Sequence, residues 1–579
     1  MSTKTDEIDL LQAARCEDLQ YGQIRELSVL GDFEKRVILT LKGAGAHLLQ
    51  GARGVGKSML LRSAEIEMDS AFAKDRQLAV YVNFKTSTLL EGVKAGERDA
   101  FQLWVNLKIL QSLHEKLKQL DLIKQDREQD PYYRVFRIES VHSTTQALQE
   151  KIHLLQKLAR ATNTETVLAE LGSEFLDRAL DTGFLVEMVR ELIEHFQLQR
   201  LIFLFDEAAH TFIPAQQEIF FEIFKLLHGE KIAVKAAVYP TVTSYGRNFE
   251  VGQDAIVISM DRFEPGESGR SANRRLFRDL LDRRLPTRTA LRKQIFNRGE
   301  LLDTCIDLST GNPRAFLHLL NRAVEQGFSD RAVTLATQEF VDQELLPYHL
   351  NLAKRLPKFA SHVRVGYDLL RGYLIPEIRT KNHRQTKSGY QSAFFTVPRD
   401  MSPNLKLSLD VLCYSGMLVN KGTVKIADRQ TGLRYMVHFA ILAAEKAFVS
   451  TKLTDAISLI SLTDYREFSS SDAQITTYLR QLHEAGDHCQ ECSARIPPNA
   501  KFCPDCGQRL EVTSIIGPLL DEPVDALSLS HALRERVKPA FPKVGDVVQA
   551  TREEVMRIKW IKEVRSRIIK NAADEFISG

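Results

Sequence analysis

Residues 51–58 read GARGVGKS, and this stretch decides the fold. It matches G-x-x-x-x-G-K-[ST] at every fixed position, a pattern in which glycines let successive backbone N–H groups face phosphate oxygens. An apolar run, AHLLQ at 46–50, precedes it, and a helical pattern, MLLRSAE at 59–65, follows it. This strand–loop–helix context predicts a site for the phosphates of ATP, facing the positive end of the helix. The residues expected to bind the nucleotide here are Gly51, Arg53, Gly54, Val55, Gly56, Lys57, Ser58 and Met59.

Two residues of this loop have chemical roles of their own. Lys57 would supply a positive charge to the β- and γ-phosphates, and it therefore counts among the expected catalytic residues. Ser58 would offer its hydroxyl to Mg²⁺. The alternative interpretation of the stretch is an ordinary glycine-rich turn between a strand and a helix.

A second acidic site is expected after another apolar strand. Residues 201–207 read LIFLFDE. Asp206 would emerge at the carboxyl end of the strand, where it can take part in the coordination shell of the Mg²⁺ that accompanies the nucleotide. Glu207 would accept a proton from the attacking water and so act as the catalytic base. The alternative for Glu207 is an acid that only complements the dipole of a following helix; His210 is interpreted as an ordinary helix residue.

The distribution of apolar runs predicts the fold class. Besides 46–50 and 201–205, short runs rich in β-branched and aromatic residues occur at 79–84, 232–239 and 255–259. Because helical patterns separate these runs, we expect an α/β fold with a parallel sheet covered by helices on both faces. The long interval from about 100 to 195 predicts a helical insertion.

Two weaker signals follow the fourth predicted strand. Thr241, Thr243 and Ser244 carry hydroxyls that could sense the γ-phosphate or could equally cap a turn. Further on, Asn312 and Pro313 predict the start of a helix. Arg314 would lie in the first turn of that helix, where its charge opposes the dipole. A phosphate partner would explain this arginine.

A cluster of cysteines predicts a metal site near the C-terminus. Two Cys-x-x-Cys pairs flank a short spacer that contains two prolines. Four thiolates in tetrahedral array close the coordination shell of Zn²⁺, so the predicted role is structural. The expected zinc ligands are Cys489, Cys492, Cys503 and Cys506, with His488 as a neighbour.

Length and charge set the frame for these sites. A chain of 579 residues is long enough for about four domains. The formal net charge is only +3, so any nucleic-acid binding would depend on local basic surfaces. No apolar run is long enough for a membrane helix and the N-terminus is acidic, so we expect a cytoplasmic protein without a membrane partner.

The order of these features resembles the AAA+ ATPases of the origin-recognition and archaeal replication-initiator type, over about residues 20–330. The resemblance implies ATP hydrolysis, and it implies that Arg314 is a second sensor, catalytic and in contact with the γ-phosphate. It also implies that one of four arginines reaches the nucleotide of a neighbouring subunit in a homo-oligomer, at least when ATP is bound. These candidates, for which a solvated basic helix face is the alternative, are Arg274, Arg275, Arg283 and Arg284.

Residues 525–577 resemble the C-terminal domain of the bacterial RNA polymerase α subunit and related helix-hairpin-helix modules. Thr551 and Glu554 predict a capping box at a helix start. The family's hairpin offers backbone N–H groups to DNA phosphate, whereas residues 559–562 here contain no glycine. The alternative is a protein-binding module with Trp560 as an exposed anchor. The predicted phosphate-facing patch comprises Lys559, Lys562, Arg565, Arg567 and Lys570.

Together these features predict five regions and a function. The function is an initiator-like ATPase that couples nucleotide state to DNA or partner engagement; the alternative is a defence or signalling NTPase switch, similar to signal-transduction ATPases, that recruits a protein effector. The expected domains are an ATPase core at 1–260, a helical lid at 261–330, a winged-helix or helical domain at 331–480, a zinc ribbon at 485–512 and the helix-hairpin-helix-like domain at 520–579.

Overall fold

The structure is a computed structural model of the whole chain. It describes residues 13, 15–85, 97–123, 144–158, 179–207, 214–240, 242–261, 263–264, 266–285, 289–356, 359–384, 389–426, 431–449, 453–461, 463–469, 472–484, 505–507 and 516–578. The chain divides into two compact units. The sheet unit comprises residues 20–50, 57–260 and 514–579, and the lid unit comprises residues 1–19, 51–56 and 261–513.

A five-stranded parallel sheet forms the centre of the sheet unit, in the order β2-β3-β4-β1-β5. All five predicted strands are confirmed; β3 and β4 are buried almost throughout, whereas β5 lies at the edge of the sheet with Ile256 61% exposed. The strands are β1 (Ala46–Gln50), β2 (Gln77–Asn83), β3 (Arg200–Asp206), β4 (Ile232–Val238) and β5 (Ile256–Ser259).

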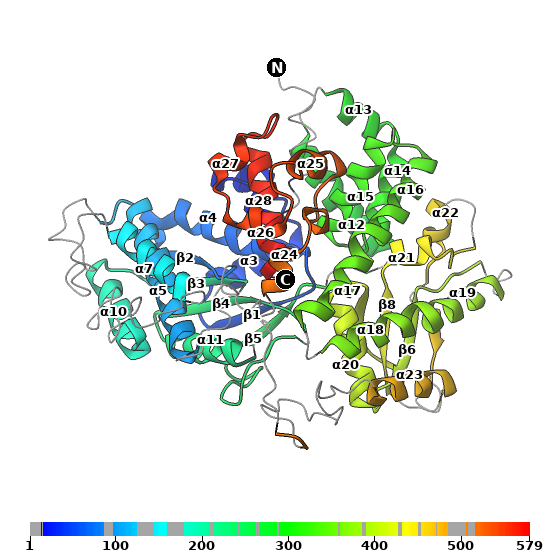
Figure 1. Cartoon of the computed structure of the whole chain (residues 1–579), viewed down its shortest axis with the longest axis horizontal. Coiled ribbons are helices and arrows are strands. Elements are labelled where there is room, and N and C mark those ends of the chain that lie inside the picture. Colours follow the sequence, from blue (N-terminus) through cyan, green and yellow to red (C-terminus); the bar gives the residue numbers. More distant parts are fainter. Residues whose placement is uncertain are drawn as a thin grey trace. The chain divides into compact units, whose positions relative to one another are not determined.

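Helices cover the two faces of this sheet, which confirms the predicted α/β class. The helix α4 (Lys57–Asp75) lies on one side of the strands and α11 (Pro214–Leu227) on the other (Figure 1). Within the predicted helical insertion, the described residues are mainly helical, and Trp104 in its first helix is fully buried. The insertion contains α5 (Glu97–Gln119), α7 (Thr144–Leu158) and α10 (Thr182–His195), while the N-terminal part of the unit contributes α2 (Tyr21–Leu27) and α3 (Asp32–Lys42).

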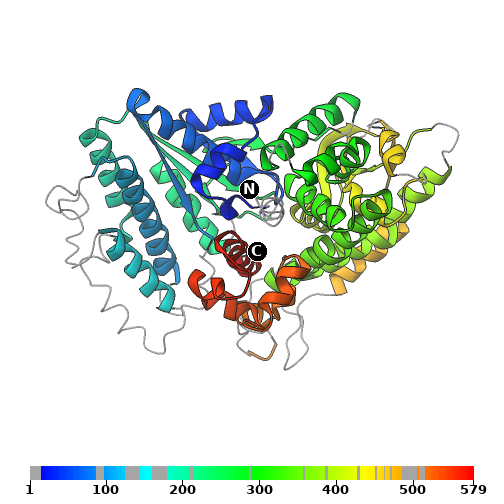
Figure 2. The ribbon, with the colours of Figure 1, turned by 90° about the horizontal axis from the view of Figure 1, so that it is seen from above.

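The C-terminal helices belong to the sheet unit and have a small apolar core of their own. Gln20 Nε2 donates a hydrogen bond to Glu563 Oε1 at 3.0 Å, and Lys85 Nζ donates one to the Asn571 carbonyl at 3.4 Å, so the last helix contacts the N-terminal part of the unit (Figure 2). The helices are α24 (Ile516–Asp521), α25 (His531–Val537), α26 (Val544–Gln549), α27 (Arg552–Met556) and α28 (Glu563–Ser578), with a 3₁₀ turn at Val524–Ala526.

The first part of the lid unit is helical, and a short 3₁₀ turn (Cys16–Asp18) from the N-terminus belongs to the same unit. Its helices pack around the fully buried Phe277 and Phe316. They are α12 (Glu267–Arg284), α13 (Ala290–Phe296), α14 (Gly299–Leu308), α15 (Pro313–Glu325), α16 (Asp330–Phe340), α17 (Leu346–Arg355), α18 (Ala360–Leu369) and α19 (Ile375–Arg384), with π-helical turns at Val341–Leu345 and Leu370–Leu374.

A four-stranded sheet, β7-β8-β6-β9, follows in the same unit. The sequence predicts a hairpin that pairs 417–426 with 433–442. Leu418 does pair with Val437 in an antiparallel hairpin of β7 and β8, but the second strand ends at Val437, and residues 439–442 belong to the helix α21 instead. The winged-helix assignment for 331–480 stays a prediction. The remaining elements are β6 (Phe394–Pro398), α20 (Pro403–Tyr414), β7 (Leu418–Lys425), β8 (Thr431–Val437), α21 (Phe439–Ala444), α22 (Leu453–Ser458), β9 (Tyr465–Glu467) and α23 (Ala473–Glu484).

The run of basic residues between 379 and 387 predicts a loop from the sequence, and this prediction is wrong for its first part. Arg379, Lys381, His383 and Arg384 lie on α19, and Lys387 lies outside the described residues. Burial of Ile375 and Ile378 holds this helix in place despite its charge. No helix among the described ranges is long and apolar enough to cross a membrane.

Candidate functional site: a nucleotide-phosphate site

The backbone of the loop between β1 and α4 has the conformation that the glycine pattern requires. Gly54 and Gly56 have φ values of +81° and +96°. A side chain in this left-handed region is strained, so glycine is needed at both positions for conformational reasons. The helix α4 begins at Lys57, directly after the loop.

Lys57 is buried, with 6% of its surface exposed. Its ammonium nitrogen lies 4.0 Å from the centroid of the Tyr239 ring, a cation–π geometry. Tyr239 follows the last residue of β4, at the strand end after which the sequence offers hydroxyl side chains that could sense the γ-phosphate. An aromatic face therefore stabilises the lysine charge at this position.

Asp206 ends β3 and is 2% exposed. Its Oδ1 accepts a hydrogen bond from the Glu207 backbone N–H at 3.0 Å, and its Oδ2 accepts one from the Tyr81 hydroxyl at 2.7 Å. Both carboxylate oxygens are thus held by donors of the sheet unit. A carboxylate held by two hydrogen bonds presents its oxygen lone pairs to a cation in one defined orientation.

Glu207 has an unusual backbone conformation for a residue with a side chain, at φ +59°. Such left-handed residues cost about 1–3 kcal/mol and cluster at functional sites. The side chain is buried. Because residues 208–213, including His210, lie outside the described residues and α11 begins only at Pro214, the helix-dipole alternative for Glu207 stays open.

Within the lid unit, the start of α15 contacts the loop. Asn312 Oδ1 accepts hydrogen bonds from the Arg314 and Ala315 backbone N–H groups at 3.0 and 3.2 Å, which confirms the predicted N-cap. The Nδ2 of the same side chain donates to the Arg53 carbonyl at 2.7 Å. A Cβ on Gly54 would lie 2.6 Å from Asn312 Oδ1 and 2.8 Å from Arg314 Cβ. The structure therefore brings the predicted residue Arg314 against the phosphate loop.

Arg53 extends this contact to a second helix of the lid unit, α17. Its Nη1 lies 3.5 Å from the Tyr348 hydroxyl, and its guanidinium carbon lies 5.8 Å from the centroid of the same ring. Tyr348 belongs to α17. Nothing in the sequence pattern pointed to this pair, because the two residues are far apart along the chain.

We expect the two functions of Asn312 to separate in two variants. Asn312→Ala removes the cap and should lower the free energy of unfolding by about 0.5–2 kcal/mol. Asn312→Asp keeps the capping oxygen but cannot donate to the Arg53 carbonyl, so it should retain most of the stability while weakening ATP binding. Urea unfolding and equilibrium binding of a fluorescent ATP analogue measure the two effects. Equal ATP affinity in Asn312→Asp and the unmodified chain would contradict the role of the donor.

Of the two described hydroxyl residues after β4, Thr243 caps the turn. Thr243 Oγ1 accepts from the Tyr239 N–H at 3.2 Å and donates to the Tyr239 carbonyl at 2.8 Å. The Ser244 N–H donates to Gln217 Oε1 at 2.6 Å. The capping alternative therefore fits Thr243, whereas the Ser244 hydroxyl lies 3.4 Å from Glu218 Oε1 on α11, and Thr241 lies outside the described residues.

The four candidate arginines of α12 fall into two classes. Arg274 pairs with Asp307 and lies 3.7 Å from Asp303, and the buried Arg284 donates to the Ala13 carbonyl at 2.5 Å. Burial lowers the pKa of Arg284 to about 10. Both are therefore used inside the lid unit, whereas Arg275 and Arg283 are exposed.

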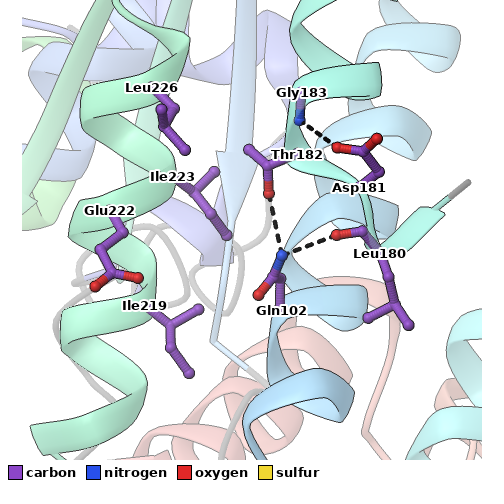
Figure 3. A pocket seen from close by; sticks show the side chains of 9 residues that line it. All are labelled: Gln102, Leu180, Asp181, Thr182, Gly183, Ile219, Glu222, Ile223 and Leu226. Carbon is purple, nitrogen blue, oxygen red and sulfur yellow. Dashed lines mark hydrogen bonds between the residues drawn. The ribbon is translucent and has the colours of Figure 1, made fainter. Parts of the chain in front are cut away.

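A cavity of about 330 Å³ lies between the insertion helices α5 and α10 and the sheet-covering helix α11 (Figure 3). Gln102 Nε2 donates to the Leu180 carbonyl at 2.8 Å and to Thr182 Oγ1 at 3.2 Å, and Asp181 caps α10. These polar groups hold the helices of the insertion together. The cavity is lined by Gln102, Leu180, Asp181, Thr182, Gly183, Ile219, Glu222, Ile223 and Leu226.

Of the four predicted zinc ligands, only Cys506 lies among the described residues, where it is exposed. Cys489, Cys492 and Cys503 lie outside them. Coordination by these four thiolates stays a prediction.

In the turn between α27 and α28, Trp560 adopts the left-handed backbone conformation that a glycine usually adopts. Trp560 has φ +70° and is 67% exposed, and Arg565 Nη1 donates to its carbonyl at 2.9 Å. Lys559 and Lys562 are exposed beside it. The capping box of Thr551 and Glu554 is confirmed.

Two members of the predicted basic patch are wrong. Lys570 Nζ donates to the Val547, Val548 and Ala550 carbonyls at 2.7–2.9 Å, so it caps the end of α26, and burial lowers its pKa. Arg567 is 5% exposed. Lys570 is directed toward the end of α26, and the buried Arg567 forms an ion pair with Glu563 at 3.3 Å, which leaves Lys559, Lys562 and Arg565 as candidates at the surface.

Comparisons with known proteins agree with this organisation. The ORC-CDC6-like family model matches residues 12–300, and a zinc-ribbon domain model matches residues 488–510. No curated protein matches the chain.

Among solved structures, the chain is similar to the Walker-type ATPase PABY2304 of Pyrococcus abyssi, with 14% identity and a TM-score of 0.33 over 72% of this chain and 94% of that chain. It is also similar to the Aeropyrum pernix ORC2 protein in ADPNP–ADP complexes, with 11% identity and a TM-score of 0.30 over 74% of this chain and 92% of that one. The Aeropyrum pernix ORC1 protein in complex with DNA matches at 13% identity and a TM-score of 0.28, over 73% and 93% of the two chains.

Proposed function

The chain is an ATPase whose residues 12–300 belong to the ORC-CDC6-like family, and we propose that it couples ATP binding and hydrolysis to the engagement of duplex DNA. In this proposal Lys57 and the loop glycines bind the phosphates of ATP. Ser58 and Asp206 hold Mg²⁺, which neutralises phosphate charge when it is bound. Glu207 orients and deprotonates the attacking water.

The observation that supports coupling is the contact between the phosphate loop and the start of α15. Asn312 and Arg314 pack against Gly54, and Asn312 donates to the Arg53 carbonyl. A γ-phosphate that repositions this loop would therefore change the contacts of the lid unit. Arg314, as the second sensor, would add a charge that distinguishes ATP from ADP. A ligand shifts such an equilibrium by its difference in affinity for the two states.

Two further features complete the proposal. A structural Zn²⁺ held by Cys489, Cys492, Cys503 and Cys506 would fold the ribbon at 488–510. Arg275 and Arg283 on α12 are exposed, and one of the α12 arginines would reach the nucleotide of a neighbouring copy in an ATP-bound homo-oligomer. Arg274 is used within its own chain by Asp307.

DNA would be bound through phosphates at the C-terminal hairpin. Lys559 and Lys562 flank the exposed Trp560, while Arg565 holds the carbonyl of the hairpin tip. The left-handed conformation of Trp560 provides the turn that a glycine provides in related hairpins. Phosphate contacts of this kind position a protein on a duplex without reading its sequence.

We expect Lys559→Glu with Lys562→Glu to weaken binding about equally on unrelated DNA duplexes. If both lysines contact phosphates, the slope of log affinity against log salt should fall by about 1.8, at 0.9 per contact. Fluorescence anisotropy of the full chain with labelled duplexes at several salt concentrations measures this slope.

The matched control reverses two other exposed lysines of the same module, Lys538 and Lys543, which pair with Asp525 and Asp521. Exposed pairs of this kind contribute little to stability. The control should keep the slope of the unmodified chain. An equal change in both double variants would mean that only the net charge matters, and the hairpin would lose its assigned role.

The large exposed surface of Trp560 supports a second candidate function, the recruitment of a protein effector in a defence or signalling switch. Exposed tryptophans are common anchors of protein interfaces. In that case Trp560→Ala, but not the lysine reversal, would abolish partner binding. Absence of salt-sensitive DNA binding in the full chain would favour this candidate.

A further inference from the structure

We propose that Tyr81 is a positioning residue that sets the orientation in which Asp206 binds Mg²⁺. This inference rests on the proposed function, because it takes Asp206 as a ligand of the ion. The observation that supports this inference most directly is the hydrogen bond from the Tyr81 hydroxyl to Asp206 Oδ2, at 2.7 Å.

The sheet register brings the two residues together. Asn83 of β2 pairs with Asp206 of β3, and Tyr81 pairs with Leu204. Residues two apart on a strand point to the same face, so Tyr81 is the diagonal neighbour of Asp206 on that face. A tyrosine is long enough to span such a diagonal, whereas most polar side chains are not. Asn83 Nδ2 also lies 3.4 Å from the Tyr81 hydroxyl, so the hydroxyl has a donor on its other side.

The Tyr81 ring is itself held by α4. The guanidinium carbon of Arg62 lies 4.5 Å from the ring centroid of Tyr81 and 5.4 Å from that of Tyr21. Arg62 Nη1 forms an ion pair with Glu65 Oε2 at 2.6 Å. The arginine is therefore fixed between two aromatic faces and a carboxylate.

This arrangement links the two proposed Mg²⁺ ligands. Ser58 and Arg62 lie one turn apart on α4, since helix residues four apart share a face. Arg62 contacts the Tyr81 ring, and the Tyr81 hydroxyl contacts Asp206. The helix that carries one ligand thus determines the orientation of the other.

The consequence for Asp206 is rotational restraint. The Glu207 N–H holds Oδ1 and the Tyr81 hydroxyl holds Oδ2. Removal of the hydroxyl takes away the donor that holds Oδ2 and so weakens the rotational restraint on the carboxylate. Loss of a hydrogen-bond partner of a metal ligand lowers metal affinity by about 10- to 100-fold.

The test is Tyr81→Phe in the full chain, which removes only the hydroxyl. Binding of a fluorescent ATP analogue is followed while Mg²⁺ is added, and again in EDTA. We expect the Mg²⁺ concentration for the half-maximal response to rise by about tenfold or more, with unchanged nucleotide affinity in EDTA. A purely structural role would alter both affinities together.

Two variants make the outcome decisive. Tyr245→Phe removes another buried hydroxyl of the sheet unit, one without a hydrogen-bond partner among the described residues, and should leave the Mg²⁺ response unchanged. Asp206→Asn should shift the response at least as far as Tyr81→Phe. A shift in Asp206→Asn without one in Tyr81→Phe would overturn the role of Tyr81 alone. No shift in either variant would overturn the proposed Mg²⁺ site as well.

Discussion

Glu207→Gln is expected to keep ATP bound while lowering its turnover by about 10²- to 10⁴-fold, the range contributed by a general base. Glutamine preserves the size of the side chain and can still hydrogen-bond to water, but it cannot accept the proton. The left-handed backbone of Glu207 places the side chain in a strained position that only the surrounding structure maintains. Steady-state phosphate release and equilibrium nucleotide binding, measured on the same preparation, give the two quantities.

Lys57→Ala is the matched variant, because it should lose binding itself. A hydrogen bond to a charged group contributes about 1.5–3 kcal/mol, and the lysine would contact two phosphates. The cation–π contact with Tyr239 is lost at the same time. Parallel loss of ATP binding in both variants would refute the assignment of Glu207 to the water, and full turnover in Glu207→Gln would refute it as the base.

Removal of zinc is expected to have the largest effect on folding. Binding of a structural Zn²⁺ by such small modules has an apparent free energy of about 10–16 kcal/mol at neutral pH. We therefore expect one zinc per chain, and its loss in the double variant Cys503→Ser with Cys506→Ser. The ATPase rate and the main melting transition should persist, because the sheet of the sheet unit is built from other residues.

Elemental analysis of the purified chain and of the double variant measures the zinc content. Cys16→Ser is the control, because Cys16 lies at the other end of the chain, in the 3₁₀ turn before α2. It should retain the metal. Zinc-free protein with an intact ribbon, or loss of the main melting transition in the double variant, would contradict a separate metal-folded module.

Local sequence determined much of the secondary structure and local backbone conformation of this protein. The five apolar runs became the five strands, because strands of a parallel sheet covered by helices favour continuous apolar residues, and only the edge strand β5 is largely outside the core. The positive φ values of Gly54 and Gly56, the Asn312 cap and the Thr551 capping box follow from the backbone chemistry of those residues alone. These features depend on neighbours within a few positions, and the sequence shows such neighbours directly.

Tertiary structure alone decided which distant side chains meet. Register between β2 and β3 brings Tyr81 to Asp206, and packing of α15 brings Asn312 to the Arg53 carbonyl. The basic patch was wrong at Lys570 because charge along a sequence does not show which face of a helix is buried. Contacts between residues tens to hundreds of positions apart arise from the packing of whole elements, and that packing minimises the free energy of many side chains at once.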